Sequence, residues 1–214
     1  MKKIYCISGL GADEKAFAKI KVPGCQLEHL IWLAPEKNES IEAYAKRMAA
    51  QIKEEHPILM GLSFGGMLCI EISKLVSAEK VILISSIPSY KQLPWWMKAA
   101  GKLKLNKILP IRSYTNTLEP VQNYFMGAKT KDELAIVRHY RKNVEQGLLD
   151  WSVDAILNWK NDWQPPNLLR IHGDADRIFP FRKTQSGFVV KGGTHFMIFS
   201  RAKEVNQCLA SIAN

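Results

Sequence analysis

Short, nearly continuous apolar runs recur along the chain, and segments with helical periodicity separate most of them. The runs are KKIYCIS (2–8), QLEHLIWL (26–33), HPILMGL (56–62), KVILISS (80–86), NLLRIHG (167–173) and GFVV (187–190). Strands that are apolar on both faces suit a parallel sheet covered on both sides by helices. The alternation therefore predicts an α/β fold with about six parallel strands joined by right-handed crossovers.

One gap between strands is far longer than a single helix requires. Roughly eighty residues separate Ile87 from Asn167, and they combine helical periodicity, several prolines and five of the six tryptophans. The other connections fit one helix each, as in residues 40–53, which begin at the favoured N-cap residue Ser40. We therefore expect one structural domain, with a core at 1–87 and 167–214 and a helical insertion at 88–166.

The overall charge and the cysteines exclude few classes of protein. The formal net charge is +10, which suits a nucleic-acid or anionic-membrane partner but equally a basic enzyme surface, and no nucleic-acid motif is recognisable. The four cysteines lack the short spacing of a zinc site or dithiol motif, so we expect reduced, mostly buried thiols and no metal.

The opening MKKIYCISGLGADEK reads better as a core strand than as a signal peptide, and the cytoplasm is the expected location.

The stretch MGLSFGG (60–66) places Ser63 between glycines directly after an apolar run. Taken alone, the pattern also suits a glycine-rich turn in which the hydroxyl bonds to the backbone. After a strand and before a helix, however, a sharp turn would lift the serine to the carboxyl edge of the sheet, and Gly61 and Gly65 would permit the close backbone approach. The context favours Ser63 as a nucleophile.

A serine nucleophile needs a base and a group that orients the base. His195 in KGGTHFMIF follows the last expected strand and is the favoured base, while His172 at the end of LLRIHG remains a rival. For the acid, HGDADRIFP offers Asp174 and Asp176, although an aspartate beside glycine is also a common turn residue.

These motifs resemble the α/β-hydrolase superfamily, in which the acid follows a strand in the pattern Gly-x-x-Asp-x-Ile/Val-x-Pro. Gly173, Asp176, Ile178 and Pro180 match that pattern, so the resemblance favours Asp176 as the acid and Asp174 as a turn residue. The order Ser63, Asp176, His195 is also the order of the superfamily. The other position that some members use for the acid reads ISSIPS here and contains no carboxylate.

The resemblance covers residues 2–86 and 167–213 and implies a three-layer α/β-hydrolase fold without the first two strands of the superfamily. It also implies an oxyanion hole made by the backbone N–H groups of Phe64 and Leu10, although Ser8-Gly9 replaces the usual His-Gly. No cofactor is implied. The insertion matches no family that we can name.

Three functions remain open at this point. The first is a serine hydrolase that cleaves a small carboxylic ester or thioester, or an acyltransferase with the same triad. The second is a hydrolase-like binding or signalling protein with slow turnover. The third is a nucleic-acid or membrane-surface protein. Haloalkane and epoxide hydrolases are disfavoured because their nucleophile is an aspartate.

The segment KQLPWWMKAAGKLKLNKILPIR (91–112) carries six basic residues and no acidic one. A basic amphipathic helix of this kind could lie on an anionic membrane or close a cap over the substrate site. We favour the cap, because Pro94 and Pro110 leave only about fifteen residues of continuous helix. Trp95, Trp96 and Met97 are then the expected residues of the substrate pocket. The sequence does not indicate an oligomeric state.

Overall fold

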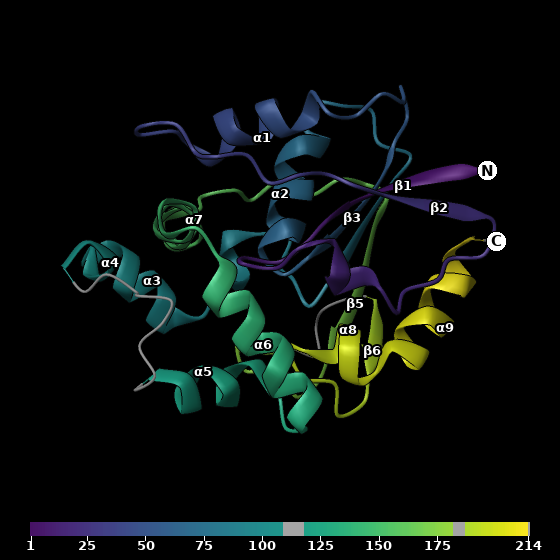
Figure 1. The fold of residues 1–214 in the computed structure, drawn as a ribbon. Helices are drawn as coiled ribbons and strands as arrows, with labels where there is room; N and C mark the ends of the chain where they lie inside the picture. Colours follow the sequence, from purple (N-terminus) through teal and green to yellow (C-terminus); the bar gives the residue numbers. More distant parts are fainter. Residues whose placement is uncertain (109–117, 182–186, 214) are drawn as a thin grey trace.

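The computed structural model describes residues 1–108, 118–181 and 187–213 (Figure 1). Within these residues a six-stranded sheet, parallel at every pairing, has the order β2-β1-β3-β4-β5-β6. Its strands are β1 (Lys2–Ile7), β2 (Cys25–His29), β3 (Ile58–Leu62), β4 (Lys80–Ile84), β5 (Leu168–Gly173) and β6 (Phe188–Val190). The predicted parallel α/β architecture is confirmed.

Side chains of the strands alternate between two buried clusters, one on each face of the sheet. Tyr5 and Ile7 face α1 (Ile41–Ala49) and α2 (Phe64–Ser73). Ile4 and Cys6 face the 3-10 turn η1 (Glu14–Phe17) and the helices α8 (Met197–Ser200) and α9 (Ala202–Ala213). This alternation follows from the period of two in a strand and explains why the runs are apolar throughout. The result is three layers, helix on sheet on helix.

The long connection between β4 and β5 is helical in its described part. It contains η2 (Tyr90–Gln92), α3 (Trp95–Lys102), α4 (Leu105–Ile108), α5 (Glu119–Met126), α6 (Lys131–Asn143) and α7 (Gln146–Asn158). Thr130 and Glu133 form a capping box that starts α6. Figure 1 places α3 to α7 at the end of the sheet toward which β1 runs from the N-terminus. The strands therefore end beneath this insertion.

The stretch that begins at Pro94 forms two short helices in its described part and not one continuous helix. α3 ends at Lys102, and Lys104 has a φ of 53°, a left-handed conformation that interrupts an α-helix. Gly101 packs directly against the backbone carbonyl of Leu157 in α7, where a Cβ would collide. Residues 109–112 of the expected basic segment lie outside the described residues.

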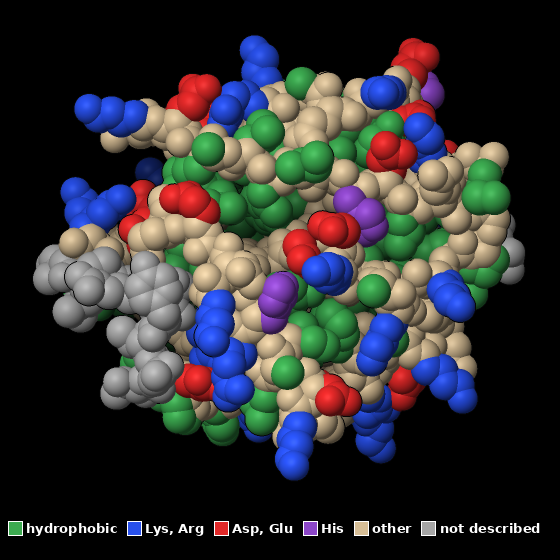
Figure 2. Space-filling model, in the orientation of Figure 1, with side chains coloured by type: hydrophobic (Ala, Val, Ile, Leu, Met, Phe, Trp, Pro, Cys, Tyr) green, Lys and Arg blue, Asp and Glu red, His purple; other side chains and the backbone are tan. Residues whose placement is uncertain are grey.

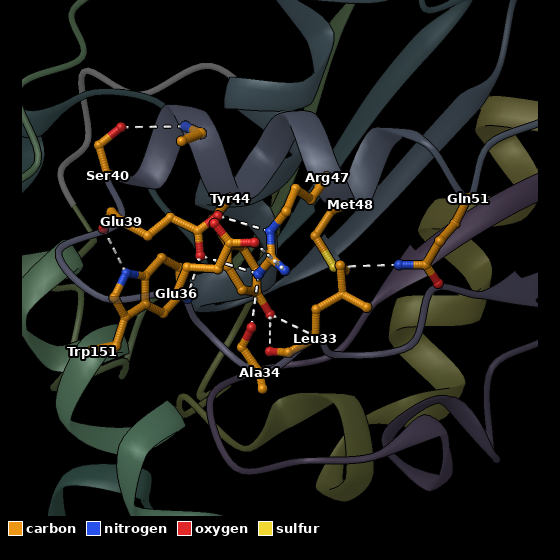
Figure 3. A network of polar contacts seen from close by, with 11 residues as sticks. Leu33, Ala34, Glu36, Glu39, Ser40, Tyr44, Arg47, Met48, Gln51 and Trp151 are labelled. Carbon is orange, nitrogen blue, oxygen red and sulfur yellow. Dashed lines mark hydrogen bonds and ion pairs between the residues drawn. The ribbon is translucent and has the colours of Figure 1, made fainter.

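Two tryptophans fasten the insertion to the layer of α1 and α2. The indole Nε1 of Trp151 in α7 donates to the backbone carbonyl of Glu39, 2.8 Å away, and the Nε1 of Trp159 donates to the buried carboxylate of Glu71, 2.7 Å away. Figure 3 shows Trp151 reaching the segment that precedes α1, where Arg47 pairs with Glu39. A buried indole N–H requires such a partner, so these contacts fix where α7 lies.

Lysine and arginine side chains are scattered over the face drawn in Figure 2 and are interspersed with acidic ones. No described helix is long and apolar enough to cross a membrane. The interspersed acidic side chains mean that the excess positive charge is not concentrated into a stripe on the face drawn in Figure 2.

All four cysteines are free thiols; Cys6 and Cys69 are buried, and Cys25 and Cys208 are partly buried.

Candidate active site

Ser63 lies in the tight turn between β3 and α2. Its φ of 52° and ψ of −121° are unusual for a non-glycine residue. Its backbone N–H donates to the carbonyl of Ile84 over 2.9 Å, and its own carbonyl accepts from the Ser86 hydroxyl over 2.6 Å. These two bonds, one to the last residue of β4 and one to Ser86 just beyond it, hold a strained conformation in place.

The glycines around Ser63 are required by backbone packing. A Cβ on Gly61 would collide with the backbone of Gly65 and Gly66, and a Cβ on Gly65 would collide with the carbonyls of Ile7 and Ser8. The start of α2 is therefore pressed against the ends of β3 and β1. This close packing brings Ser63 to the carboxyl edge of the sheet, as the sequence predicted.

His195 lies in the loop between β6 and α8, and both of its ring nitrogens have partners. Nε2 is 2.8 Å from the Ser63 Oγ, and Nδ1 is 2.8 Å from the Asp176 Oδ2. Because a carboxylate only accepts, Nδ1 must carry a proton in this contact. In the neutral ring, Nε2 then has the free lone pair that faces the serine hydroxyl. The ring is 4% exposed.

Asp176 follows β5, and both of its carboxylate oxygens are occupied. Oδ1 accepts from the N–H groups of Ile178 and Phe179 at 2.8 and 2.9 Å, while Oδ2 faces His195. Burial alone would raise the pKa of this carboxyl, but His195, His172 and the Phe179 amide together hold the pKa below its ordinary value. The side chain is therefore a buried, ionised acceptor.

Asp174 and His172, the alternative acid and the alternative base, bond mainly to backbone groups. Asp174 Oδ1 accepts from the N–H of Gly192, 2.5 Å away, which ties the acid loop to the loop that carries His195. His172 Nε2 is 2.8 Å from the carbonyl of Phe179, to which it must donate. Burial lowers the pKa of His172 despite the nearby Asp176. The structure thus brings His195, rather than His172, to Ser63.

The two expected oxyanion donors, the backbone amides of Phe64 and Leu10, belong to two segments that lie next to Ser63. Phe64 is the first residue of α2, and Leu10 lies in the turn Ser8–Ala12, which the bond from the Ala12 N–H to the Gly9 carbonyl closes. Gly9 is close enough to Ser63 that an added Cβ would lie 3.4 Å from the serine Cβ. In the described part of the chain, neither amide donates to another protein group. The assignment of these two amides as oxyanion donors stays a prediction.

Sequence reasoning missed Trp32 and Ser8 as part of this site. The Trp32 Nε1 donates to the Ser8 Oγ over 2.8 Å, and its ring stacks on Phe64 with centroids 5.8 Å apart. The available signal was a tryptophan near the end of the expected strand 26–33, because a partly buried indole usually bonds to a fixed acceptor.

The expected pocket residues differ in their surroundings. Trp95 is 79% exposed, and Trp96 is 40% exposed with its ring 6.0 Å from that of Phe125. Met97 packs against the buried cluster that contains Phe64. A pocket formed by these three residues stays a prediction.

The described residues contain no group of three or more His, Cys, Asp or Glu side chains that could hold a metal ion.

No protein-family model and no curated protein matches this sequence. Solved structures do match. An esterase from Exiguobacterium antarcticum has a TM-score of 0.74 at 14% identity, over 100% of this chain and 92% of that one. An alpha/beta hydrolase fold protein from Burkholderia ambifaria has a TM-score of 0.72 at 13% identity, over 98% and 90%.

A bromoperoxidase from Bacillus anthracis has a TM-score of 0.71 at 19% identity, over 97% of this chain and 90% of that one. At these identities the likeness shows the arrangement of the helices and strands. The chemistry has to be argued from the side chains of this chain.

Proposed function

We propose that this chain, which has the α/β-hydrolase fold, is a serine hydrolase that cleaves a carboxylic ester or thioester through an acyl-enzyme. One observation carries the proposal: the continuous set of contacts from the Ser63 Oγ through both nitrogens of His195 to the buried carboxylate of Asp176. A serine nucleophile, a neutral imidazole and an orienting carboxylate in this order are the parts that acyl transfer requires.

In the first half of the proposed reaction, the Ser63 Oγ attacks the substrate carbonyl carbon and its proton passes to His195 Nε2. The imidazolium is stabilised by Asp176, whose pKa is held low enough to keep it charged. The negative charge that develops on the carbonyl oxygen is stabilised by the N–H groups of Leu10 and Phe64. Collapse expels the alcohol or thiol, which takes the proton from His195.

In the second half, His195 takes a proton from water, and the resulting hydroxide attacks the acyl carbon. The same two amides hold the second oxyanion, and the proton on His195 returns to Ser63 as the carboxylic acid leaves. Each group ends in its starting state. The two half-reactions together consume one ester and one water, so the proposal requires no cofactor.

The insertion at 88–166 is proposed to act as the helical cap over this site. Val144, which caps α6, lies next to Gly11 in the turn that carries Leu10, because a Cβ on Gly11 would be 3.3 Å from the Val144 Cβ. Trp151 of α7 contacts the ring of Phe64, with centroids 5.8 Å apart. Parts of the insertion therefore border both expected oxyanion donors, which supports a role in substrate contact.

The experiment that tests the function combines a probe with a substrate panel. Wild-type protein should be labelled by a fluorophosphonate and should hydrolyse members of a series of p-nitrophenyl esters and acyl-CoA thioesters of graded chain length. Ser63→Ala serves as the matched control and should neither be labelled nor turn over. A wild-type protein that is inert toward the probe and toward every ester and thioester would exclude the proposal.

A further inference from the structure

The hydroxyl of Ser8 closes the turn that carries Leu10. It donates to the backbone carbonyl of Ala12, 2.5 Å away, and accepts the indole N–H of Trp32, 2.8 Å away. Ser8 is 5% exposed, so water does not readily replace either partner. The indole N–H therefore fixes one end of a short turn in which Leu10 lies between Gly9 and Gly11.

The same indole also touches the other side of the site. Its ring lies nearly parallel to that of Phe64, at an interplanar angle of 15° and a centroid distance of 5.8 Å. Phe64 is fully buried and begins α2 directly after Ser63. One side chain thus contacts both segments whose backbone amides are the expected oxyanion donors, although those segments belong to different crossovers of the sheet.

The backbone next to Trp32 is held by hydrogen bonds to Tyr44. The Tyr44 hydroxyl donates to the carbonyl of Leu33 over 2.8 Å and accepts from its N–H over 3.0 Å, so the residue after Trp32 is pinned on both backbone groups. Burial raises the pKa of Tyr44 to about 12, which keeps the hydroxyl protonated. Figure 3 shows Tyr44 beside Leu33 in this network. The backbone that carries Trp32 is therefore fixed.

We infer that Trp32 is a positioning residue for the oxyanion hole: its N–H bond to Ser8 and its stacking on Phe64 set the distance between the Leu10 and Phe64 amides. This inference rests on the proposed hydrolase function. Two donors stabilise an oxyanion only when both aim at the same point, and a fixed spacing avoids reorganisation during the reaction. Trp32 does not touch the reacting atoms and acts through the two backbone segments.

The inference predicts a specific kinetic signature. Trp32→Phe keeps a ring against Phe64 but removes the donor, and Ser8→Ala removes the acceptor. Each should lower kcat on an activated ester about tenfold, less than the roughly 10²- to 10³-fold loss caused by deleting an oxyanion donor outright. KM should change little, because the ester carbonyl in the ground state bonds weakly to the amides. The double variant should be no slower than Ser8→Ala alone, which already removes the bonds to both Trp32 and the Ala12 carbonyl.

A transition-state analogue provides the readout that a general loss of stability would not move. A trifluoromethyl ketone forms a hemiketal oxyanion on Ser63, so its inhibition constant should rise in both variants by the same factor by which kcat/KM falls. Trp159→Phe is the matched control, because it removes a buried indole N–H bond to the Glu71 carboxylate without touching the Ser8 turn or Phe64. It should leave kcat and inhibition unchanged.

Two results would overturn the inference while leaving the hydrolase function standing. One is an active wild-type protein whose kcat and inhibition by the ketone are unaffected by Trp32→Phe and Ser8→Ala. The other is a loss of activity in Trp32→Phe and Ser8→Ala that matches that of Trp159→Phe and follows the melting temperature alone. If the wild type is labelled but turns over no ester, the labelling rate replaces kcat. A wild type inert to probe and esters refutes the proposed function itself, and the inference with it.

Discussion

Gly173 and Gly193 touch backbone to backbone: a Cβ on Gly173 would collide with the carbonyl of Gly193. That carbonyl also accepts from the N–H of Ala175 over 2.9 Å. The loops that carry Asp176 and His195 thus diverge from one point of contact. A side chain at either glycine would push the loops apart, so the distance between the carboxylate and the imidazole depends on residues that take no part in the chemistry.

The different contacts of Asp176 and Asp174 predict that the same substitution at the two positions has very different effects on kcat. Asp176→Asn should lower kcat by about 10⁴-fold, because the amide can donate to Nδ1 and so favour the wrong tautomer of His195. Asp174→Asn should leave kcat nearly unchanged, since an amide oxygen can still accept the Gly192 N–H. Steady-state kinetics on one activated ester compares them. A larger loss of kcat in Asp174→Asn than in Asp176→Asn would show that Asp174 is the residue that orients His195.

The backbone conformation of Ser63 predicts how the stabilities of a glycine and an alanine variant at this position compare. Ser63→Ala and Ser63→Gly should both lose turnover by about 10³-fold or more. The glycine variant should nevertheless be more stable than the alanine variant by about 1 kcal/mol, because only glycine adopts the conformation at Ser63 without strain. Thermal or urea unfolding measures the difference. If alanine proves more stable, the backbone at this turn is not strained.

His172 predicts a dependence of stability on pH. Its pKa in the folded protein is lowered, chiefly by burial, whereas the unfolded chain titrates near the ordinary value of about 6.5. Between the two values the unfolded state binds more protons, so the contribution of His172 is fully present above about pH 6.5 and is lost as the pH falls through the lower, folded value.

The test compares wild type with His172→Gln, whose amide can still donate to the Phe179 carbonyl. Urea unfolding from about pH 8 to about pH 5 should show the wild type losing more stability than the variant on acidification. Parallel curves would mean that His172 titrates alike in the folded and unfolded chains.

The exposed tryptophans of the insertion separate the pocket prediction from the membrane alternative. Replacing Trp95 and Trp96 with alanine should alter the chain-length preference in the ester panel more than the hydrolysis of an acetyl ester, if these rings contact the acyl chain. Sedimentation with vesicles of anionic lipid is the second measurement. Unchanged selectivity together with lost vesicle binding would replace the pocket with a membrane contact.

The alternation of apolar runs was sufficient to predict the parallel sheet, and five of the six expected strands lie within two residues of the observed bounds. The expected strand at 26–33 ends early, at His29, because the chain leaves the sheet after Leu30, whose N–H still donates to the Cys6 carbonyl. There Trp32 turns toward Ser8 and Leu33 bonds to Tyr44. An apolar pattern identifies buried residues but does not distinguish a strand from an extended segment held by side-chain bonds.

The contacts among Ser63, Asp176 and His195 could be anticipated because parallel strands bring their carboxyl ends to one edge. The helices of the insertion could not be placed, since their packing depends on contacts between distant residues. The break after α3 follows from the backbone of Lys104 and the approach of Leu157 to Gly101, neither of which a helical periodicity reports. The contact from Trp32 to Ser8 likewise needs the fold to bring two crossovers together.

β4 and β5 are neighbours in the sheet although roughly eighty residues lie between them. The chain must therefore close a long loop before these strands pair, which slows folding more than it weakens the folded state. Closure entropy grows only with the logarithm of loop length, so lengthening a crossover from roughly twenty to roughly eighty residues costs about 1 kcal/mol. Shortening or rebuilding the α3–α7 segment should thus be tolerated thermodynamically wherever its tryptophan anchors are kept, which makes this crossover the natural place to graft a different specificity.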